Sequence, residues 1–332
     1  MQTFAVIRAR GDWLVAAASP RVTLVLLALL AAGVGATYAL DAGATFALSA
    51  PLGLLALNLT AAIAANPVFR RQTGLLVFHL ALLALVVLAA AGRLTYLKGQ
   101  LELAEGEVFD GQLSQSESGR WHRSQLERAQ FANAGFTIRY EKGVSRAETR
   151  NAVRWLDESG GERSAVIGDN EPLVRHGYRF YTSSNKGFAP VFVWHPTGGA
   201  PWRGTINLPS YPIHEYRQAL EWTVPGTRTT LWTMLQFDEV LLDPEQVSQF
   251  RLPEKHTLVV RIGEARHELA PGASLTLPQG VLEYERLSTW MGYTVFYDWT
   301  LPWLFAACVL AVASLAWHFW QKCQALPWDR DA

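Results

Sequence analysis

Two histidines lie inside long apolar stretches of this sequence, and they are its first candidates for chemistry. His79 is the sixth residue of the apolar run 74–92, and His318 lies near the end of the run 299–320. Ionisable side chains at membrane depth are rare and usually functional. Imidazole binds metals and is a common axial ligand of haem iron. His79 is therefore the main candidate for holding haem b, with metal contact through the haem iron only.

Each histidine also has a structural interpretation. An unsatisfied polar group in lipid costs several kcal/mol, so His79 could simply bond to a neighbouring helix through Asn58 or Thr60. His318 stands between Trp317 and Trp320, a composition typical of an interfacial aromatic belt. The functional alternative is that His318 and His79 approach one haem from similar depths. In a third arrangement, which we favour, the second axial ligand comes from a partner subunit.

Four apolar segments must position these side chains. Residues 22–40, 46–65, 74–92 and 299–320 each run for about 20 residues without Asp, Glu, Lys or Arg, enough to cross a hydrocarbon core of about 30 Å. The first segment is too long for a signal peptide and is expected to be retained. The sequence thus predicts an integral membrane protein with three transmembrane helices, a large extramembrane domain and a fourth transmembrane helix.

The charge pattern of the short connections predicts the orientation. The basic residues that fall on one side of the spans are Arg8, Arg10, Arg21, Arg70, Arg71 and Lys322. The turn 41–45 on the other side has none, so the positive-inside rule places both termini in the cytoplasm. Arg93 and Lys98 oppose this assignment, but they lead into a long domain, where the rule loses force. The predicted parts are a cytoplasmic N-terminus (1–21), three spans (22–92), an extracytoplasmic domain (93–298), the fourth span (299–320) and a cytoplasmic tail (321–332).

The composition of the extracytoplasmic domain predicts a mostly-β fold. Short alternating segments, at 136–140, 178–181, 190–194, 257–262 and 274–277, are separated by turn pairs such as Lys142-Gly143, Gly198-Gly199 and Gln279-Gly280. We expect a sandwich or an open barrel, with helix only in patches such as 229–236. From residue 99 to residue 298 there are 25 acidic and 20 basic residues, so no basic face for nucleic acid is expected.

Several classes of chemistry are excluded by what the domain lacks. The two cysteines, Cys308 and Cys323, fall in and just after the last span, and there is no Cys-x-x-Cys motif of a thiol-disulfide carrier. No phosphate-binding loop, His-Glu-x-x-His helix or convincing Ser/His/Asp constellation occurs. The histidines of the domain show no metal-site spacing: His122, His176, His195, His214, His256 and His267.

Several segments, in order, resemble the ResB family (also called CcsB) of cytochrome c biogenesis proteins. Residues 99–107 (GQLELAEGE) are similar to the family's short strand and Glu-Gly-Glu turn after the third span. Residues 170–173 (NEPL), 177–181 (GYRFY) and 183–184 (SS) are similar to the family's N-x-P-L…G-x-x-[FI]-Y-x-S-S block. Leu277-Pro278 and the stretch 283–298 precede the last span as in the family. The three-plus-one topology matches too, so the resemblance covers nearly the whole chain.

The resemblance implies a subunit of the bacterial system II machinery, which moves haem across the cytoplasmic membrane and attaches it to apocytochrome c. Family members work with a ResC/CcsA-type membrane partner, which carries a tryptophan-rich haem-handling motif and the outer haem ligands. The 13 tryptophans of this chain are scattered. The resemblance therefore implies a non-catalytic subunit that helps deliver haem to that partner, with its large domain on the periplasmic or outer side.

The resemblance also bears on the site. The family carries a third-span histidine assigned to haem ligation, and His79 is the matching residue. The chain is shorter than many family members and its outer domain is trimmed, which leaves room for a paralogue with a narrower role.

Two other functions stay open. An accessory or assembly subunit of another respiratory complex would tolerate replacement of His79. A b-haem electron-transfer subunit would use both His79 and His318 as ligands.

Overall fold

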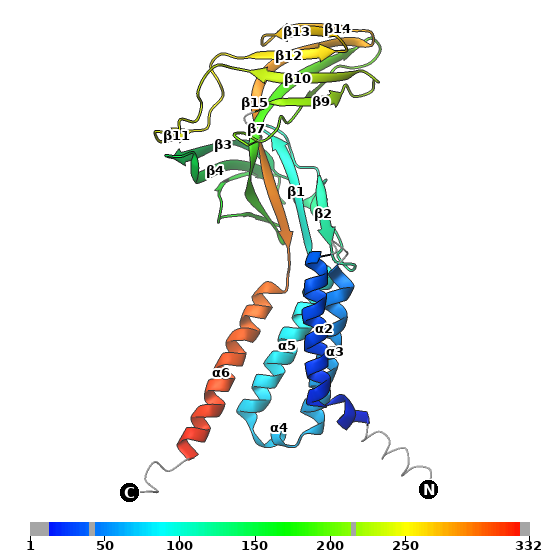
Figure 1. Cartoon of the computed structure of the whole chain (residues 1–332), viewed down its shortest axis with the longest axis vertical. Helices are drawn as coiled ribbons and strands as arrows, with labels where there is room; N and C mark the ends of the chain where they lie inside the picture. Colours follow the sequence, from blue (N-terminus) through cyan, green and yellow to red (C-terminus); the bar gives the residue numbers. More distant parts are fainter. Residues whose placement is uncertain (1–12, 40–43, 214–216, 326–332) are drawn as a thin grey trace. The chain divides into compact units, whose positions relative to one another are not determined.

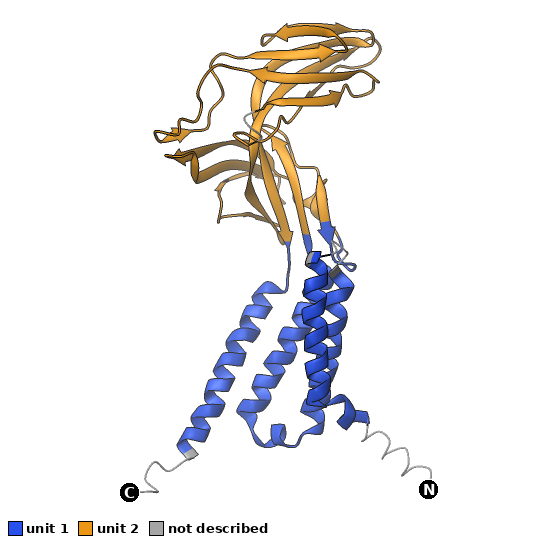
Figure 2. Cartoon of the chain, in the orientation of Figure 1, with its two compact units in different colours: residues 1–97, 117–123, 297–332 blue, residues 98–116, 124–296 orange. Residues whose placement is uncertain are grey.

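The computed structural model describes residues 13–39, 44–213 and 217–325. The chain forms two compact units, shown in Figure 2: residues 1–97, 117–123 and 297–332, and residues 98–116 and 124–296. We call them the helical unit and the β unit. Some predicted features lie outside the described residues: Arg8, Arg10, positions 41–43 of the turn, His214 and positions 326–332 of the tail.

The helical unit contains the predicted membrane spans (Figure 1). Its helices are α2 (Pro20–Ala39), α3 (Ala44–Ala65), α4 (Val68–Arg71), α5 (Thr73–Thr95) and α6 (Leu301–Ala325). All except α4 are long and apolar enough to cross a membrane. Large apolar side chains face outward, among them Leu57 (67% exposed) and Phe305 (71%), as expected for helices surrounded by lipid.

The helices pack in chain order, α2 on α3, α3 on α5 and α5 on α6. Gly33 of α2 lets the backbones approach, because a Cβ there would overlap the carbonyl oxygen of Ala47 on α3. At Gly35 a Cβ would meet nothing within 4 Å. Asn58 of α3 also joins these helices, since its Oδ1 accepts a hydrogen bond from Thr23 Oγ1 at 2.7 Å.

The β unit is built almost entirely of antiparallel strands, so the predicted fold class is confirmed. Apart from the short 3-10 helix η1 (Leu126–Arg128), its elements are β1 (Leu97–Ala104), β2 (Gln115–Ser118), β3 (Ala132–Glu141), β4 (Ser145–Leu156), β5 (Glu162–Ile167), β6 (Leu173–Arg175), β7 (Tyr178–Pro196), β8 (Trp202–Thr205), β9 (Ala219–Thr223), β10 (Thr230–Gln236), β11 (Ser248–Gln249), β12 (Thr257–Ile262), β13 (Ala265–Leu269), β14 (Ser274–Leu277) and β15 (Gly280–Tyr297).

The strands form three sheets where we expected a sandwich or an open barrel. The largest has the order β2-β1-β15-β7-β6, with β14 added on β15 and β8 on β7. The others have the orders β13-β12-β10-β9 and β11-β3-β4-β5. Figure 1 shows the long strands β7 and β15, which pair antiparallel. The pairing runs from Gly280 opposite Pro196 to Phe296 opposite Arg179, with two register shifts.

The predicted strands are all present, and the predicted helical patch is wrong. The segments 178–181 and 190–194 belong to the single strand β7. Most of the segment 229–236 is the strand β10, in which Leu231, Thr233 and Leu235 are buried and the residues between them are less so. This period of two fits pairing with β9 and β12 on either side, and it outweighs the weak helical pattern of the segment.

Buried polar side chains tie the sheets of the β unit together. Tyr293 Oη donates to Asn151 Oδ1 at 2.8 Å, and Asn151 Nδ2 donates to Asn133 Oδ1 at 2.8 Å. Asn133 Nδ2 in turn donates to the Leu103 carbonyl at 2.9 Å. All three polar side chains are almost fully buried, so the network specifies how β3, β4 and β15 meet.

Candidate functional site

His79 lies on α5, and a single hydrogen bond fixes the proton on its ring. Nδ1 is 2.8 Å from the carbonyl oxygen of Leu75, one turn earlier in the same helix. A carbonyl oxygen only accepts, so Nδ1 is the donor. In the neutral imidazole Nε2 then carries a lone pair. Metal-binding histidines usually donate their other ring N–H in this way, which orients the ring.

Two aromatic rings hold His79 from the sides. The Phe69 ring centroid is 4.5 Å from that of His79 in an edge-on arrangement, and that of Phe78 is 5.3 Å away. Phe69 belongs to α4, the short helix before α5, and it is buried. Its neighbours Arg70 and Arg71 in the same short helix are exposed. The two aromatic neighbours therefore fix the orientation of the His79 ring. The helix α4, which contributes Phe69, also carries the exposed cations Arg70 and Arg71.

The alternative partners expected for His79 are engaged elsewhere. Asn58 bonds to Thr23 and, through Nδ2, to the Ala17 carbonyl at 2.6 Å. Thr60 Oγ1 donates to the Ala56 carbonyl of its own helix at 2.7 Å. Asn58 is thus a helix-packing group, and the bond that satisfies His79 comes from α5 itself.

His318 faces α5 and does not lie in the aromatic belt. It is 6% exposed, whereas Trp317 is 46% and Trp320 64% exposed. A Cβ built on Gly74 would come within 3.0 Å of His318 Cβ, so the two helices touch here. The Trp side chains form the outward aromatic surface that we expected, and His318 points away from it.

The contact at Gly74 is one end of a seam of small residues between α5 and α6. At the other end a Cβ on Gly92 would come within 2.7 Å of Thr300 Oγ1. The two contacts give an antiparallel register. Seven residues along α5 from Gly74 and seven back along α6 from His318 lie Ala81 and Ala311, both buried. Small side chains are what close helix approach in a membrane requires.

The structure does not bring the two histidines together. His79 is five residues after Gly74, which places it about 140° around α5 from the face that meets α6. Its ring neighbours are Phe69 and Phe78, whereas the ring of His318 contacts that of Phe319. Among the described residues no ring contact joins the two histidines.

Sequence reasoning missed Phe69 and Gly74. Phe69 directly precedes the Arg70–Arg71 pair, and the pair was used only for orientation. Gly74 opens the third apolar run, where a glycine carries no distinctive signal. Their roles depend on which residue of a distant segment stands opposite, and the spacing of the sequence does not contain this information.

The segments that carry the family resemblance have structural roles in the β unit. Glu107 Oε2 accepts a hydrogen bond from the Ala104 amide at 2.9 Å, and Gly106 between them has a φ of +91°. A Cβ on Gly292 would come within 2.7 Å of Ser183 Oγ, where β7 and β15 shift register. Within the described ranges no cluster of three or more His, Cys, Asp or Glu could hold a metal ion.

Comparison with known proteins supports the resemblance. The model of the ResB-like family matches residues 57–216. This stretch begins in α3 and includes α5, β1 and β7. No curated protein matches the chain. The matched stretch includes His79 and the segments at 99–107 and 170–184 that carried the resemblance. The predicted resemblance is therefore confirmed for residues 57–216, which match the ResB-like family.

Proposed function

We propose that the chain is a membrane subunit of a system II cytochrome c maturation complex in which α5 holds haem b through Nε2 of His79. The family match supports the general part, a membrane subunit in cytochrome c biogenesis. The observation that carries the haem assignment is the bond from His79 Nδ1 to the Leu75 carbonyl. It leaves Nε2, the nitrogen that remains free, with its lone pair pointing away from the helix backbone.

The residues around His79 suit haem. Phe69 and Phe78 offer apolar edges beside the imidazole, and Arg70 and Arg71 are exposed cations close in sequence to this aromatic support. Guanidinium groups pair well with carboxylates such as haem propionates. When bound, haem supplies the iron-containing macrocycle that is attached to apocytochrome c. The role of this chain is to fix the orientation of the His79 imidazole and to present its Nε2 to the haem.

In this proposal a ResC/CcsA-type partner would supply the other protein ligand of the haem. His318 is the other histidine of the described spans, and it is buried against Gly74 on a different face of α5. A ligand supplied by another subunit would let haem pass on when the subunits rearrange. The β unit then scaffolds apocytochrome c beside the partner. In this proposal the partner carries out the covalent attachment of haem to apocytochrome c, and this chain is a non-catalytic subunit.

The helical unit also supports the predicted orientation. Because Gly74 meets His318, Arg70 and Arg71 lie at the same end of the helix pair as Lys322, which matches a cytoplasmic face in a bacterial inner membrane. Arg93, which opposed this assignment, forms an ion pair with Glu117 at 3.1 Å. Its positive charge is thereby offset at the other end of α5.

The test is a haem-stained denaturing gel of membranes from a strain that lacks this gene. Rescue lanes carry the wild-type chain, His79→Ala and, as the matched control, His318→Ala. Wild type and His318→Ala should restore the covalent haem bands, and His79→Ala should not.

The other outcomes separate the rival functions. Restoration by all three chains would remove His79 from the haem path and favour an accessory subunit of another complex. Loss with both histidine variants, together with a bis-histidine spectrum of the purified wild-type chain alone, would favour a b-haem electron-transfer subunit.

A further inference from the structure

A second candidate site lies in the β unit, far along the chain from His79. It is a cavity of about 330 Å³ whose lining comes from the start of β3, the ends of β4 and β6, and the segment around η1. Phe131 is buried in its wall, whereas Val108 (57% exposed) and Leu156 (65%) leave apolar surface uncovered. Trp155 also lines it. A cavity with this lining favours a ligand that has an apolar or aromatic part.

Three guanidinium groups line the same cavity: Arg128, Arg154 and Arg175. Arg154 pairs with Glu162 at 3.7 Å, so its charge is partly compensated. In the described part of the chain no carboxylate pairs with Arg128 or Arg175. Two cations therefore remain for an anionic ligand.

Arg175 is held in place with a donor to spare. Its Nη2 donates to the Leu156 carbonyl at 3.3 Å, and its guanidinium lies 5.3 Å from the centre of the Trp155 ring. Its Nε is buried and has no hydrogen-bond partner among the described residues. A buried donor without a partner costs free energy, so a ligand oxygen at this position would be stabilising.

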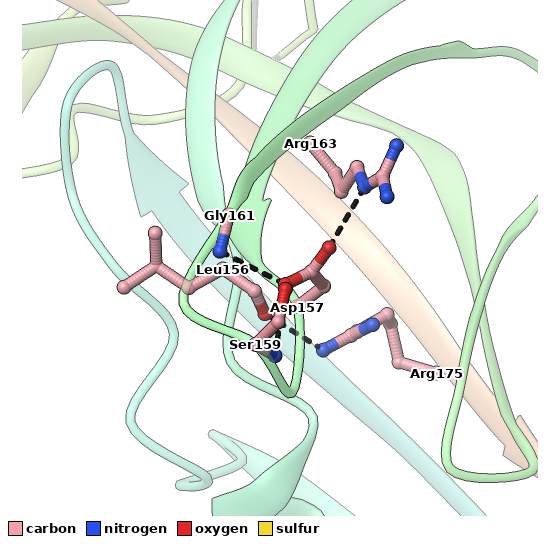
Figure 3. Close-up of polar contacts among 6 residues, drawn as sticks. All are labelled: Leu156, Asp157, Ser159, Gly161, Arg163 and Arg175. Carbon is pink, nitrogen blue, oxygen red and sulfur yellow. Dashed lines mark hydrogen bonds and ion pairs between the residues drawn. The ribbon is translucent and has the colours of Figure 1, made fainter.

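The hairpin turn between β4 and β5 keeps a fourth arginine out of this site (Figure 3). Asp157 accepts hydrogen bonds from Ser159 Oγ at 2.6 Å, from the Gly161 amide at 2.9 Å and from Arg163 Nε at 2.9 Å. Arg163 is therefore committed to Asp157, while Arg175 reaches the Leu156 carbonyl of the same turn. The turn thus fixes which guanidinium is available.

We infer that this cavity binds one edge of a porphyrin, with its apolar ring against Val108, Trp155 and Leu156 and its two propionates on Arg128 and Arg175. The choice of a porphyrin rests on the proposed function, which makes haem the cargo. The volume is at the lower end for ligand pockets, about 300–1,000 Å³, so most of the macrocycle stays outside the protein. No histidine lines the cavity. The proposed site therefore recognises the propionate carboxylates of the porphyrin and makes no bond to a metal ion in its centre.

The test measures binding of metal-free protoporphyrin to the full chain in nanodiscs, in the His79→Ala background. Its dimethyl ester, with the same ring and no carboxylates, is the control ligand. Protoporphyrin should bind at least about tenfold more tightly than the ester, because charge-assisted bonds to Arg are strong. Arg128→Gln and Arg175→Gln should each weaken it about tenfold and leave the ester unaffected. Arg128 is exposed, and among the described residues no hydrogen bond or ion pair of its guanidinium would be lost in the variant.

Arg163→Gln is the matched control variant, since it removes an arginine of the same hairpin that faces Asp157. Equal affinity for acid and ester, or equal losses with Arg163→Gln and Arg175→Gln, would overturn the site. Displacement of protoporphyrin by an equal concentration of palmitate would show that a single-chain carboxylate is the ligand, and would overturn the porphyrin assignment. Because His79 is absent throughout, failure here leaves the proposal for His79 standing.

Discussion

The helical unit and the β unit satisfy their polar side chains in different ways. In the helices most partners are local: His79 bonds to Leu75 and Thr60 to Ala56, each one turn back in the same helix, and Asn58, which bonds to Thr23 of α2, is an exception. In the β unit Asn151 bonds to Asn133, 18 positions away, and accepts from Tyr293, 142 positions away. Lipid offers no water to a polar group, so a carbonyl of the same helix is the dependable partner there. In the β unit polar groups can instead specify how distant strands pair.

The comparison is tested most severely at Asn151. Asn151→Leu should lower the free energy of unfolding of the β unit by about 3 kcal/mol, because it strands the buried Tyr293 hydroxyl and the Gly135 carbonyl. Guanidinium unfolding of the full chain in nanodiscs, followed by near-UV circular dichroism, measures the loss. Tyr293→Phe should lower the free energy of unfolding by less, since it leaves only the side-chain oxygen Oδ1 of Asn151 without its hydrogen-bond donor. A cost below about 1 kcal/mol for Asn151→Leu would mean that the network does not specify the fold.

The stability of the helical unit should depend more on the size of the side chains between its helices than on their polarity. Gly33→Leu should destabilise the packing of α2 on α3 by about 2 kcal/mol, because even a Cβ overlaps the Ala47 carbonyl. Gly35→Leu, two residues away on the same helix, meets open space and should have little effect. Unfolding in mixed SDS and mild detergent compares them. Similar losses for both variants would show that α2 and α3 do not approach through Gly33.

A buried lysine gives the β unit a pH dependence. Lys186 is 3% exposed, and burial, together with the nearby Arg146, lowers its pKa to about 8 although Asp169 acts in the opposite direction. Between about pH 8 and its ordinary pKa near 10.4, the unfolded chain holds a proton that the folded chain has lost. Stability should therefore rise with pH in that window.

Lys186→Met tests this by removing the titrating group. At pH 7 the variant should melt a few degrees higher than the wild-type chain, and the difference should shrink as the pH rises above 8. Differential scanning calorimetry from pH 6.5 to 10 follows both chains. A difference that does not depend on pH would assign the effect to packing.

The smallest effect is expected at Thr60. Thr60→Ala removes a hydroxyl that bonds only to the Ala56 carbonyl of its own helix, so stability should change by less than about 0.5 kcal/mol. The SDS assay used for Gly33 measures it. A loss comparable to that of Asn151→Leu would contradict the distinction between the two units.

Much of the fold follows from local sequence patterns. The four spans are predicted because lipid requires about 20 apolar residues in a row, although α5 continues past the apolar run to Thr95 and α6 to Ala325. The strand β14 is predicted because its side chains alternate between exposed and buried, and β12 because it is rich in β-branched residues, although its buried residues are consecutive. The failure at β10 has the same origin, since a short apolar segment fits two periods and only its neighbours β9 and β12 decide between them.

The site is predictable only in part. His79 stands out because a histidine in an apolar run is conspicuous, and its depth follows from counting residues. Its bond to Leu75 and its contact with Phe69 depend on side-chain rotamers and on the path of α4, which no periodicity encodes. The inward position of His318 depends in the same way on which face of α6 meets Gly74. The cavity at Arg175 combines residues from several strands and gives no local signal.

The bond between His79 and Leu75 also has a consequence for proton movement. If Nε2 carried the ring proton, the imidazole would have to change tautomer, with the proton on Nδ1, before Nε2 could bind a metal. The bond to the Leu75 carbonyl favours the tautomer with the proton on Nδ1, so Nε2 of the neutral ring already presents its lone pair. Under the proposed function, haem could then bind to and leave His79 without a change of tautomer.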